Sequence, residues 1–267
     1  MSDYLADRGI VYVAINTTSD TNAAVSARSA KHHIPGIHIT LFTDQDTKEG
    51  VFNNIVKIPS RSDIPVFKDS AQYPDQGYIA KAWYMGESPY RSTIYLDMDT
   101  FVLDDLSDVF DALDHNAYDV AAVMDEAYTM VHYHYPDMPA CLPRYNGGVI
   151  AWKWNRRTER MFSLFREYLV DNGGLWSGCD EVPFARAIHK SMVRMLTLAP
   201  EYNCRFIYPY ILRYKARILH GRPDEGNYDT ISEQVNNGVA EPGLGSYRVM
   251  YKGRKIATLE PIVGFQD

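Results

Sequence analysis

The chain has 267 residues, of which 46% are hydrophobic, and its formal net charge is −7 at pH 7. This length fits one large domain or two small ones, and the apolar fraction is ample for a buried core. Acidic and basic residues are interleaved without any basic run that would follow a phosphate backbone, which argues against a nucleic-acid-binding protein.

The cysteines and the N-terminal sequence predict the cellular compartment of the protein. Cys141, Cys179 and Cys204 are odd in number, widely spaced and without any C-x-x-C pairing. This pattern favours reduced, buried thiols over a disulfide framework or a zinc site. The first sixteen residues contain only a short apolar run, which predicts neither a signal peptide nor a membrane span. We therefore expect a soluble, cytoplasmic protein.

Strand-like and helix-like patterns alternate along the first half of the chain, as in a mostly parallel sheet covered by helices. Apolar, β-rich runs predict strands at 10–16, 37–44, 53–59, 92–96 and 118–126. Helical patterns lie between them at 21–33 and 77–87. The predicted fold class is α/β and doubly wound.

The second half begins with the stretch 145–155, in which paired glycines precede a strand, and an amphipathic helix follows at 156–172. Ser177 or Asp180 could cap the next helix. Residues 226–245 are rich in Gly, Asn and acids, which predicts a loop, and 246–267 reads as a hairpin turning at Lys252-Gly253. An isolated hairpin is marginally stable, so it packs either on its own domain or on a second subunit of a homo-oligomer.

Two carboxylates lie at the end of the predicted strand 92–96, where Asp97 and Asp99 follow a buried apolar run. Like charges this close are costly unless a cation neutralises them, which favours a metal site for a substrate diphosphate. Asp99 or Thr100 starting a turn is the structural alternative.

Two other chemistries receive less support. A haloacid-dehalogenase-type phosphatase carries its acidic motif after the first strand, with Thr or Val four residues beyond the first Asp, where this chain has Phe101. The sequence also contains neither a Walker A motif nor G-x-G-x-x-G, so a P-loop or dinucleotide site is not predicted.

The order of several short motifs resembles GT-A-fold glycosyltransferases, in particular the glycogenin-like group. In chain order these motifs are INTT, LFTD, a helix with a lysine, YLDMDT, NGGVIAW, CDE and HG. The resemblance covers roughly residues 10 to 223. It implies a Rossmann-related, mostly parallel sheet flanked by helices as a GT-A-like domain at 1–225, and then a linker loop and a small C-terminal β-hairpin extension at 226–267.

The resemblance also implies a nucleotide-diphosphate sugar, a UDP-sugar, bound at the carboxyl ends of the strands, where open α/β sheets bind ligands. A hexose would pass from this donor to a carbohydrate or other hydroxyl acceptor. A catalytically silent nucleotide- or carbohydrate-binding protein of the same fold is the main alternative, and a metal-dependent phosphatase is the third.

A divalent cation is part of what the resemblance implies. Asp97, Asp99 and His220 would hold Mn²⁺ or Mg²⁺ against the diphosphate, since hard cations prefer oxygen ligands and stabilise charge as the sugar–phosphate bond breaks. His220 lies in His-Gly-Arg-Pro instead of the longer H-x-x-G-x-x-K-P pattern of the family. Arg222 would then replace the missing lysine as the group that donates hydrogen bonds to the phosphates. A surface histidine without a ligand is the alternative for His220.

Further donor-site residues follow from the same resemblance. Lys81 would neutralise the leaving diphosphate, with a solvated helix-face lysine as the alternative. The amide of Asn146 would bond sugar hydroxyls, and Gly147 and Gly148 would admit the sugar ring. The residues expected around the nucleotide and its phosphates are Asn16, Thr17, Thr18, Asp44 and Met98.

Asp180 and Glu181 replace the frequent Asp-Gln of the family. One of these carboxylates could bond donor-sugar hydroxyls, or could act as a base toward the acceptor if the reaction inverts the anomeric centre. Helix capping is the alternative for Asp180. Retaining members need no dedicated base, and retention is the interpretation that we favour.

The irregular stretch at 126–145 is rich in Tyr and His and is predicted to form an acceptor-site loop. Its residues Tyr128, Tyr133 and Tyr135 could stack on sugar rings. A metal at His132-x-His134 is less favoured than loop packing, since no further ligands lie nearby in the sequence.

Overall fold

The computed structural model describes residues 4–15, 19–59, 76–115, 117–125, 136–139, 141–170, 180–206, 210–222, 227–236, 247–251 and 255–259. The strands of its central sheet are β1 (Ala6–Ala14), β2 (His38–Thr43), β3 (Asn54–Lys57), β4 (Tyr90–Leu96), β6 (Val120–Met124), β7 (Tyr145–Lys153) and β8 (Met195–Leu198). The helices are α1 (Ser19–His33), α2 (Gln76–Met85), α3 (Ser107–His115), α4 (Arg156–Val170), α5 (Glu181–Ser191) and α6 (Tyr228–Asn236).

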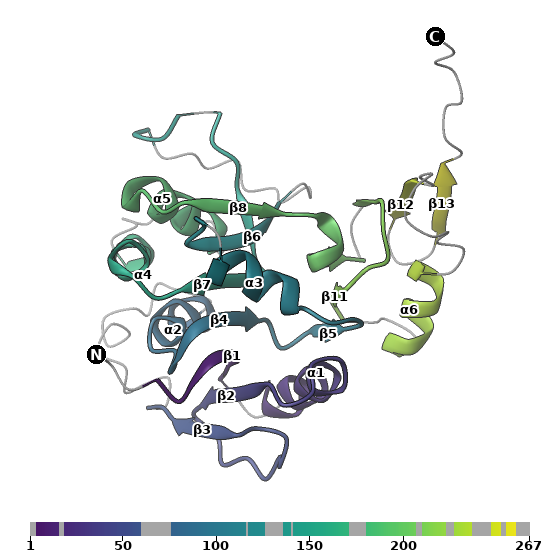
Figure 1. The fold of residues 1–267 in the computed structure, drawn as a ribbon, viewed down its shortest axis with the longest axis horizontal. Coiled ribbons are helices and arrows are strands. Elements are labelled where there is room, and N and C mark those ends of the chain that lie inside the picture. The colour runs from purple at the N-terminus through teal and green to yellow at the C-terminus, as the bar shows by residue number, and fades with distance from the viewer. Residues whose placement is uncertain are drawn as a thin grey trace.

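The central sheet has seven strands in the order β3-β2-β1-β4-β7-β6-β8, which Figure 1 shows stacked from bottom to top. All neighbours pair in parallel except β7, which runs antiparallel to both β4 and β6. The predicted mostly parallel α/β sheet is therefore confirmed. Because β7 runs backwards, its first residues lie at the same edge as the last residues of β4.

Helices cover both faces of the sheet. Alternate side chains of β1 point to opposite faces and show which helices cover each face. Val11 and Val13 belong to a core that includes residues of α2, α4 and α5, whereas Ile10 and Tyr12 belong to the core with α1 and α3. Strands buried on both faces read as continuous apolar runs, which is why the sequence revealed them. In Figure 1, α2, α4 and α5 lie together on one side of the sheet and α1 lies on the other.

Two small sheets extend the molecule beyond the central one. One has the order β5-β11-β9 and the other has the order β10-β12-β13. Their strands are β5 (Thr100–Val102), β9 (Cys204–Arg205), β10 (Tyr210–Leu212), β11 (Ile218–His220), β12 (Tyr247–Tyr251) and β13 (Lys255–Leu259), and a short 3-10 helix, η3, spans Pro200–Asn203.

The predicted C-terminal hairpin is present as the antiparallel pair β12 and β13, and β12 also pairs with β10 of the same chain. The hairpin is thus added to the edge of a strand from its own chain. The predicted turn at Lys252-Gly253 lies outside the described residues, and a homo-oligomer stays a prediction.

The loop predicted at 226–245 is wrong over residues 228–236, which form α6. Ile231 and Val235 of this helix are buried against Cys204, Phe206 and Leu219. The two apolar residues lie one turn apart and form a narrow stripe, which the Gly-, Asn- and acid-rich composition around them obscured. The face of α6 that carries Ile231 and Val235 therefore packs as part of a hydrophobic core.

The cysteines divide between interior and surface. Cys204 is fully buried, as predicted, but Cys141 is exposed, and Cys179 lies outside the described residues. The prediction of burial is wrong for Cys141, because it lies in an exposed turn between β6 and β7. None of the helices in the described ranges is long and apolar enough to cross a membrane.

Candidate active site

Asp97 and Asp99 lie on the tight turn that joins β4 to β5. The backbone N–H of Thr100 donates to the carbonyl of Asp97 at 3.1 Å, and the Thr100 hydroxyl donates to the same carbonyl at 2.7 Å. A turn therefore exists here, but it begins at Asp97 and is closed by Thr100, whereas the structural alternative had Asp99 or Thr100 starting it. Its bonds use the backbone of Asp97, so both carboxylates remain available for other partners.

His220 reaches this turn through strand pairing. β5 and β11 are antiparallel, with His220 opposite Thr100, and the N–H of Gly221 donates to the carbonyl of Asp99 at 2.9 Å. Nε2 of His220 lies 3.7 Å from an oxygen of Asp97 and 3.5 Å from an oxygen of Asp99. The small β5-β11-β9 sheet thus brings together residues that are far apart in the sequence.

One ligand atom from each of Asp97, Asp99 and His220 lies within 4.8 Å of the other two. Two carboxylate oxygens and an imidazole nitrogen form a donor set that Mn²⁺ or Mg²⁺ can accept, with carboxylate as the preferred ligand of both. Burial alone would raise the pKa of Asp99, but the nearby imidazole of His220 and the charge of Arg222 lower it. The cluster therefore fits a divalent cation.

Lys81, in α2, joins this cluster to a third carboxylate. Its ammonium lies 2.8 Å from an oxygen of Asp180 and 3.1 Å from an oxygen of Asp97, above the ring of Tyr95. The side chain is only 6% exposed, which excludes the solvated helix-face lysine. Burial would lower the pKa of Lys81, but the charges of Asp180 and Asp97 outweigh burial and raise it. Lys81 is therefore a buried lysine whose charged form is favoured by two carboxylates.

Tyr95 completes the surroundings of Asp97. Its hydroxyl donates to the Asp97 carboxylate at 2.6 Å, and the pKa of this phenol is raised well above the ordinary value by burial and by the charge of Asp97. The phenol thus stays protonated and holds one oxygen of Asp97. Tyr95 was not predicted as a site residue, because within strand β4 it reads as an ordinary core position.

The paired glycines at the start of β7 make room for side chains of the protein itself. A Cβ atom at Gly147 would lie 2.6 Å from an oxygen of Asp180 and 2.8 Å from the nitrogen of Lys81. A Cβ atom at Gly148 would lie 2.1 Å from the imidazole of His220. The space that we predicted for a sugar ring is therefore used, at least in part, to admit Lys81, Asp180 and His220.

Asp180 and Glu181 are buried at the N-terminus of α5. Asp180 occupies the N-cap position but makes no side-chain capping bond, because its carboxylate faces Lys81 instead. Glu181 accepts a 3.0 Å hydrogen bond from the amide of Asn146 on its Oε1 atom. Its Oε2 atom is buried and has no hydrogen-bond partner among the described residues.

Burial, reinforced by the charges of Asp125 and Asp180, raises the pKa of Glu181 to about 7. A raised carboxyl pKa stabilises the fold below the unfolded-state value of 4.5, and this stability is lost as the pH rises through 7. Glu181→Gln keeps the bond from Asn146 and removes the charge. We expect the variant to be more stable than the original by about 3 kcal/mol at about pH 8, with no gain at about pH 4.

Chemical denaturation across this pH range measures that difference. Glu159→Gln, at an exposed position of α4, is the matched control for the loss of one surface carboxylate. A stability gap between Glu181→Gln and the original that stays constant with pH would show that Glu181 ionises normally in the folded protein.

No protein-family model and no curated protein matches this sequence. Solved structures do match. The galactosyltransferase LgtC, in complex with donor and acceptor sugar analogs, aligns with a TM-score of 0.52 and 18% identity over 73% of this chain and 74% of that chain. Mouse xyloside xylosyltransferase 1 aligns with a TM-score of 0.55 and 12% identity over 83% of this chain and 99% of that chain.

A third match, the glycosyltransferase GlyE of Streptococcus pneumoniae, has a TM-score of 0.52 and 16% identity over 82% of this chain and 55% of that chain. The chain has the GT-A glycosyltransferase fold. This confirms the fold that the order of motifs predicted, whereas the glycogenin-like group stays a prediction.

Within the GT-A fold, the remaining predicted residues fall into two sets. Asp44 directly follows β2 and Met98 lies between the two aspartates of the turn, where it packs against the core. Arg222 is exposed and its charge acts on Asp99. The set outside the described residues comprises Asn16, Thr17, Thr18, Tyr128, His132, Tyr133, His134, Tyr135 and Ser177.

Two polar groups near the site were not predicted. Asn203, the last residue of η3, is fully buried and bonds both Asn146 and His220. Asp125, directly after β6, pairs with Arg205 at 2.8 Å and acts on the pKa of Glu181. Neither belongs to a motif that the resemblance covers, and only the tertiary structure brings them to the site.

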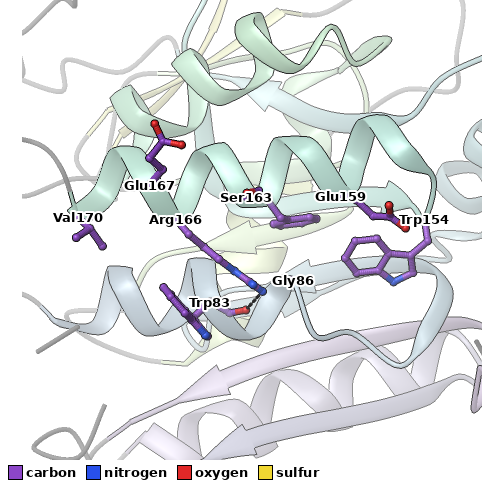
Figure 2. A pocket seen from close by; sticks show the side chains of 9 residues that line it. Trp83, Gly86, Trp154, Glu159, Ser163, Arg166, Glu167 and Val170 are labelled. Atoms are coloured by element: carbon purple, nitrogen blue, oxygen red, sulfur yellow. Dashed lines mark hydrogen bonds between the residues drawn. The ribbon is translucent and has the colours of Figure 1, made fainter. Parts of the chain in front are cut away.

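A separate hollow of about 580 Å³ lies between α2 and α4. Figure 2 shows Arg166 reaching from α4 toward Trp83 of α2, with Val170 near one end of the hollow and Trp154 near the other. Arg166 donates to the carbonyl of Trp83 at 2.5 Å and pairs with Glu87 at 2.9 Å. The lining contains none of the residues that the sequence implicated, so we do not assign this hollow to the donor.

Proposed function

We propose that the chain is a metal-dependent glycosyltransferase that moves a hexose from a UDP-sugar to a carbohydrate or other hydroxyl acceptor, with retention of configuration. The observation that carries this proposal is the cluster of Asp97, Asp99 and His220, next to the buried Lys81, in a GT-A fold. The likeness to LgtC, whose structure holds donor and acceptor sugar analogs, supports a sugar donor and a sugar acceptor.

The chemistry divides between the cation and the side chains. When bound, Mn²⁺ or Mg²⁺ supplies positive charge to a diphosphate whose negative charge grows as the sugar departs. Asp97, Asp99 and His220 would hold this cation. Lys81 fixes Asp97 and Asp180 in position and adds a buried positive charge near the leaving group. Arg222 is exposed near Asp99, and we assign to it the role of donating hydrogen bonds to the phosphates.

The donor sugar would lie beside Asn146 and the N-terminus of α5. The unpartnered Oε2 of Glu181 lacks one hydrogen bond, which a sugar hydroxyl would supply. With a pKa of about 7, Glu181 exists in both protonation states near neutral pH and can either donate to or accept from that hydroxyl. A retaining reaction fits this role, since it needs no dedicated base.

A panel of UDP- and GDP-sugars with Mn²⁺ tests the proposal through the slow release of free nucleotide. We expect one UDP-hexose to be hydrolysed, with the activity removed by EDTA and restored by Mn²⁺. Nucleotide binding without any release across the panel would instead indicate a silent binding protein. Release of phosphate from simple phosphate esters would indicate a phosphatase.

A further inference from the structure

A continuous chain of side-chain hydrogen bonds connects Glu181 to the candidate cation cluster. Asn146 donates to Glu181 at 3.0 Å, Asn203 donates to the Oδ1 atom of Asn146 at 2.8 Å, and Oδ1 of Asn203 lies 2.8 Å from Nδ1 of His220. We call Asn146 and Asn203 the amide pair. Asn203 is fully buried and Asn146 is 4% exposed, so protein atoms are their main partners.

A backbone donor fixes the orientation of both amides. The N–H of Gly148 can only donate, and it lies 2.9 Å from the side chain of Asn146, which must therefore present its oxygen there. That oxygen accepts from Asn203 with its second lone pair, so Asn203 must present its NH₂ group to Asn146. The other end of Asn203, which faces His220, is consequently the carbonyl oxygen.

The orientation of Asn203 decides the tautomer of His220. An amide oxygen only accepts, so Nδ1 of His220 must carry the proton for the 2.8 Å contact to be a hydrogen bond. In a neutral imidazole with Nδ1 protonated, Nε2 has a free lone pair. Nε2 is the atom that lies 3.5 Å from Asp99 and 3.7 Å from Asp97, on the side of the candidate cation.

We propose that Asn203 is a positioning residue of the cation site, which holds His220 as the Nδ1-protonated tautomer and aims its Nε2 lone pair at the metal. This inference rests on the metal dependence in the proposed function. Partners that orient a ligating histidine in this way typically contribute about tenfold to a hundredfold to metal affinity. Gly148 complements Asn203, because it leaves the space that the imidazole occupies.

The first measurement needs neither metal nor substrate. Nitrogen-15 labelling of the 8 histidines gives long-range correlation spectra that distinguish the two neutral tautomers, and loss of one signal in His220→Gln assigns that residue. We expect His220 of the metal-free original to carry its proton on Nδ1. A His220 spectrum with a proton on Nε2 and none on Nδ1 would overturn the proposal, even if every variant failed to fold.

The second measurement is Mn²⁺ affinity by electron paramagnetic resonance titration. Asn203→Ala should weaken binding by about tenfold to a hundredfold and remove the Nδ1-protonated signal. Asn155→Ala, which removes a half-buried amide that bonds Asp119 away from the cluster, should bind Mn²⁺ as the original does. Original-like Mn²⁺ affinity in folded Asn203→Ala would overturn the proposal.

The two readouts also separate this inference from the proposed function. If the original binds Mn²⁺ with the expected tautomer but hydrolyses none of the donor sugars, the role of Asn203 stands and the transferase assignment fails. If donor hydrolysis proceeds while Asn203→Ala retains both tautomer and affinity, the transferase assignment stands and the role of Asn203 fails.

Discussion

Asp99→Asn should lower the turnover of a donor sugar in Mn²⁺ by about a thousandfold or more, because a cation supplies several kcal/mol of charge stabilisation. The substitution keeps the volume of the side chain while it removes one of the two carboxylates in the cluster with His220. The measurement is donor hydrolysis at saturating Mn²⁺, with circular dichroism to show that the fold is intact.

Asp7→Asn is the matched control for Asp99→Asn. Asp7 is the second residue of β1, at the opposite end of the parallel strands, and its side chain is 81% exposed. The Asp7→Asn variant loses the same charge without contacting the cluster, and we expect its turnover to equal that of the original. Near-full turnover of Asp99→Asn in Mn²⁺ would contradict the metal site.

Lys81→Met should lower the free energy of unfolding by about 3 to 5 kcal/mol, since it leaves Asp97 and Asp180 without their shared buried counter-charge. Adding Asp180→Asn removes one of the two orphaned charges and should recover part of that loss. Activity is compared among the two single variants and the double variant, because Asp180 is itself a candidate donor-site residue. Denaturant titration of the two single variants and the double variant measures the coupling between the residues.

Steady-state kinetics of the Lys81 variants distinguish stabilisation of the transition state from simple anchoring of the donor. We expect kcat to fall more than the donor KM rises, because the charge that Lys81 offsets grows in the transition state. Lys81→Arg, which keeps the positive charge but replaces the ammonium with a planar guanidinium, should retain more activity than the double variant. Equal changes in kcat and KM would indicate that Lys81 only anchors the donor, and unchanged stability of Lys81→Met would contradict the buried ion pairs.

The central sheet could be predicted because its information is local. β1, β2 and β4 are apolar on both faces, and the helices between them have regular apolar spacing, so short windows of sequence were sufficient. The elements that the sequence did not reveal are β5, α3, β8, η3, α6 and the strands between η3 and α6. The strands among these are at most four residues long and owe their conformation to partners elsewhere in the chain.

The candidate site could be predicted to a similar extent. Asp97, Asp99 and His220 carry the chemistry by their residue type, and the structure places them together. Asn203 and Tyr95 act through hydrogen bonds whose partners are set by tertiary packing, and single-sequence patterns contain no such information. The neighbours of Gly147 and Gly148 show the same limit, because a glycine reveals close approach but not which group approaches.

The pairing of β5 with β11 has a consequence for the order of folding. Asp97 and Asp99 lie next to the central sheet, whereas His220 arrives only when a strand from a distant part of the chain docks on β5. Contacts across long sequence separations are slow to form, since the intervening chain must lose entropy first. The central sheet can therefore assemble while its two aspartates still lack their imidazole, and affinity for the cation would be gained as one of the last events of folding.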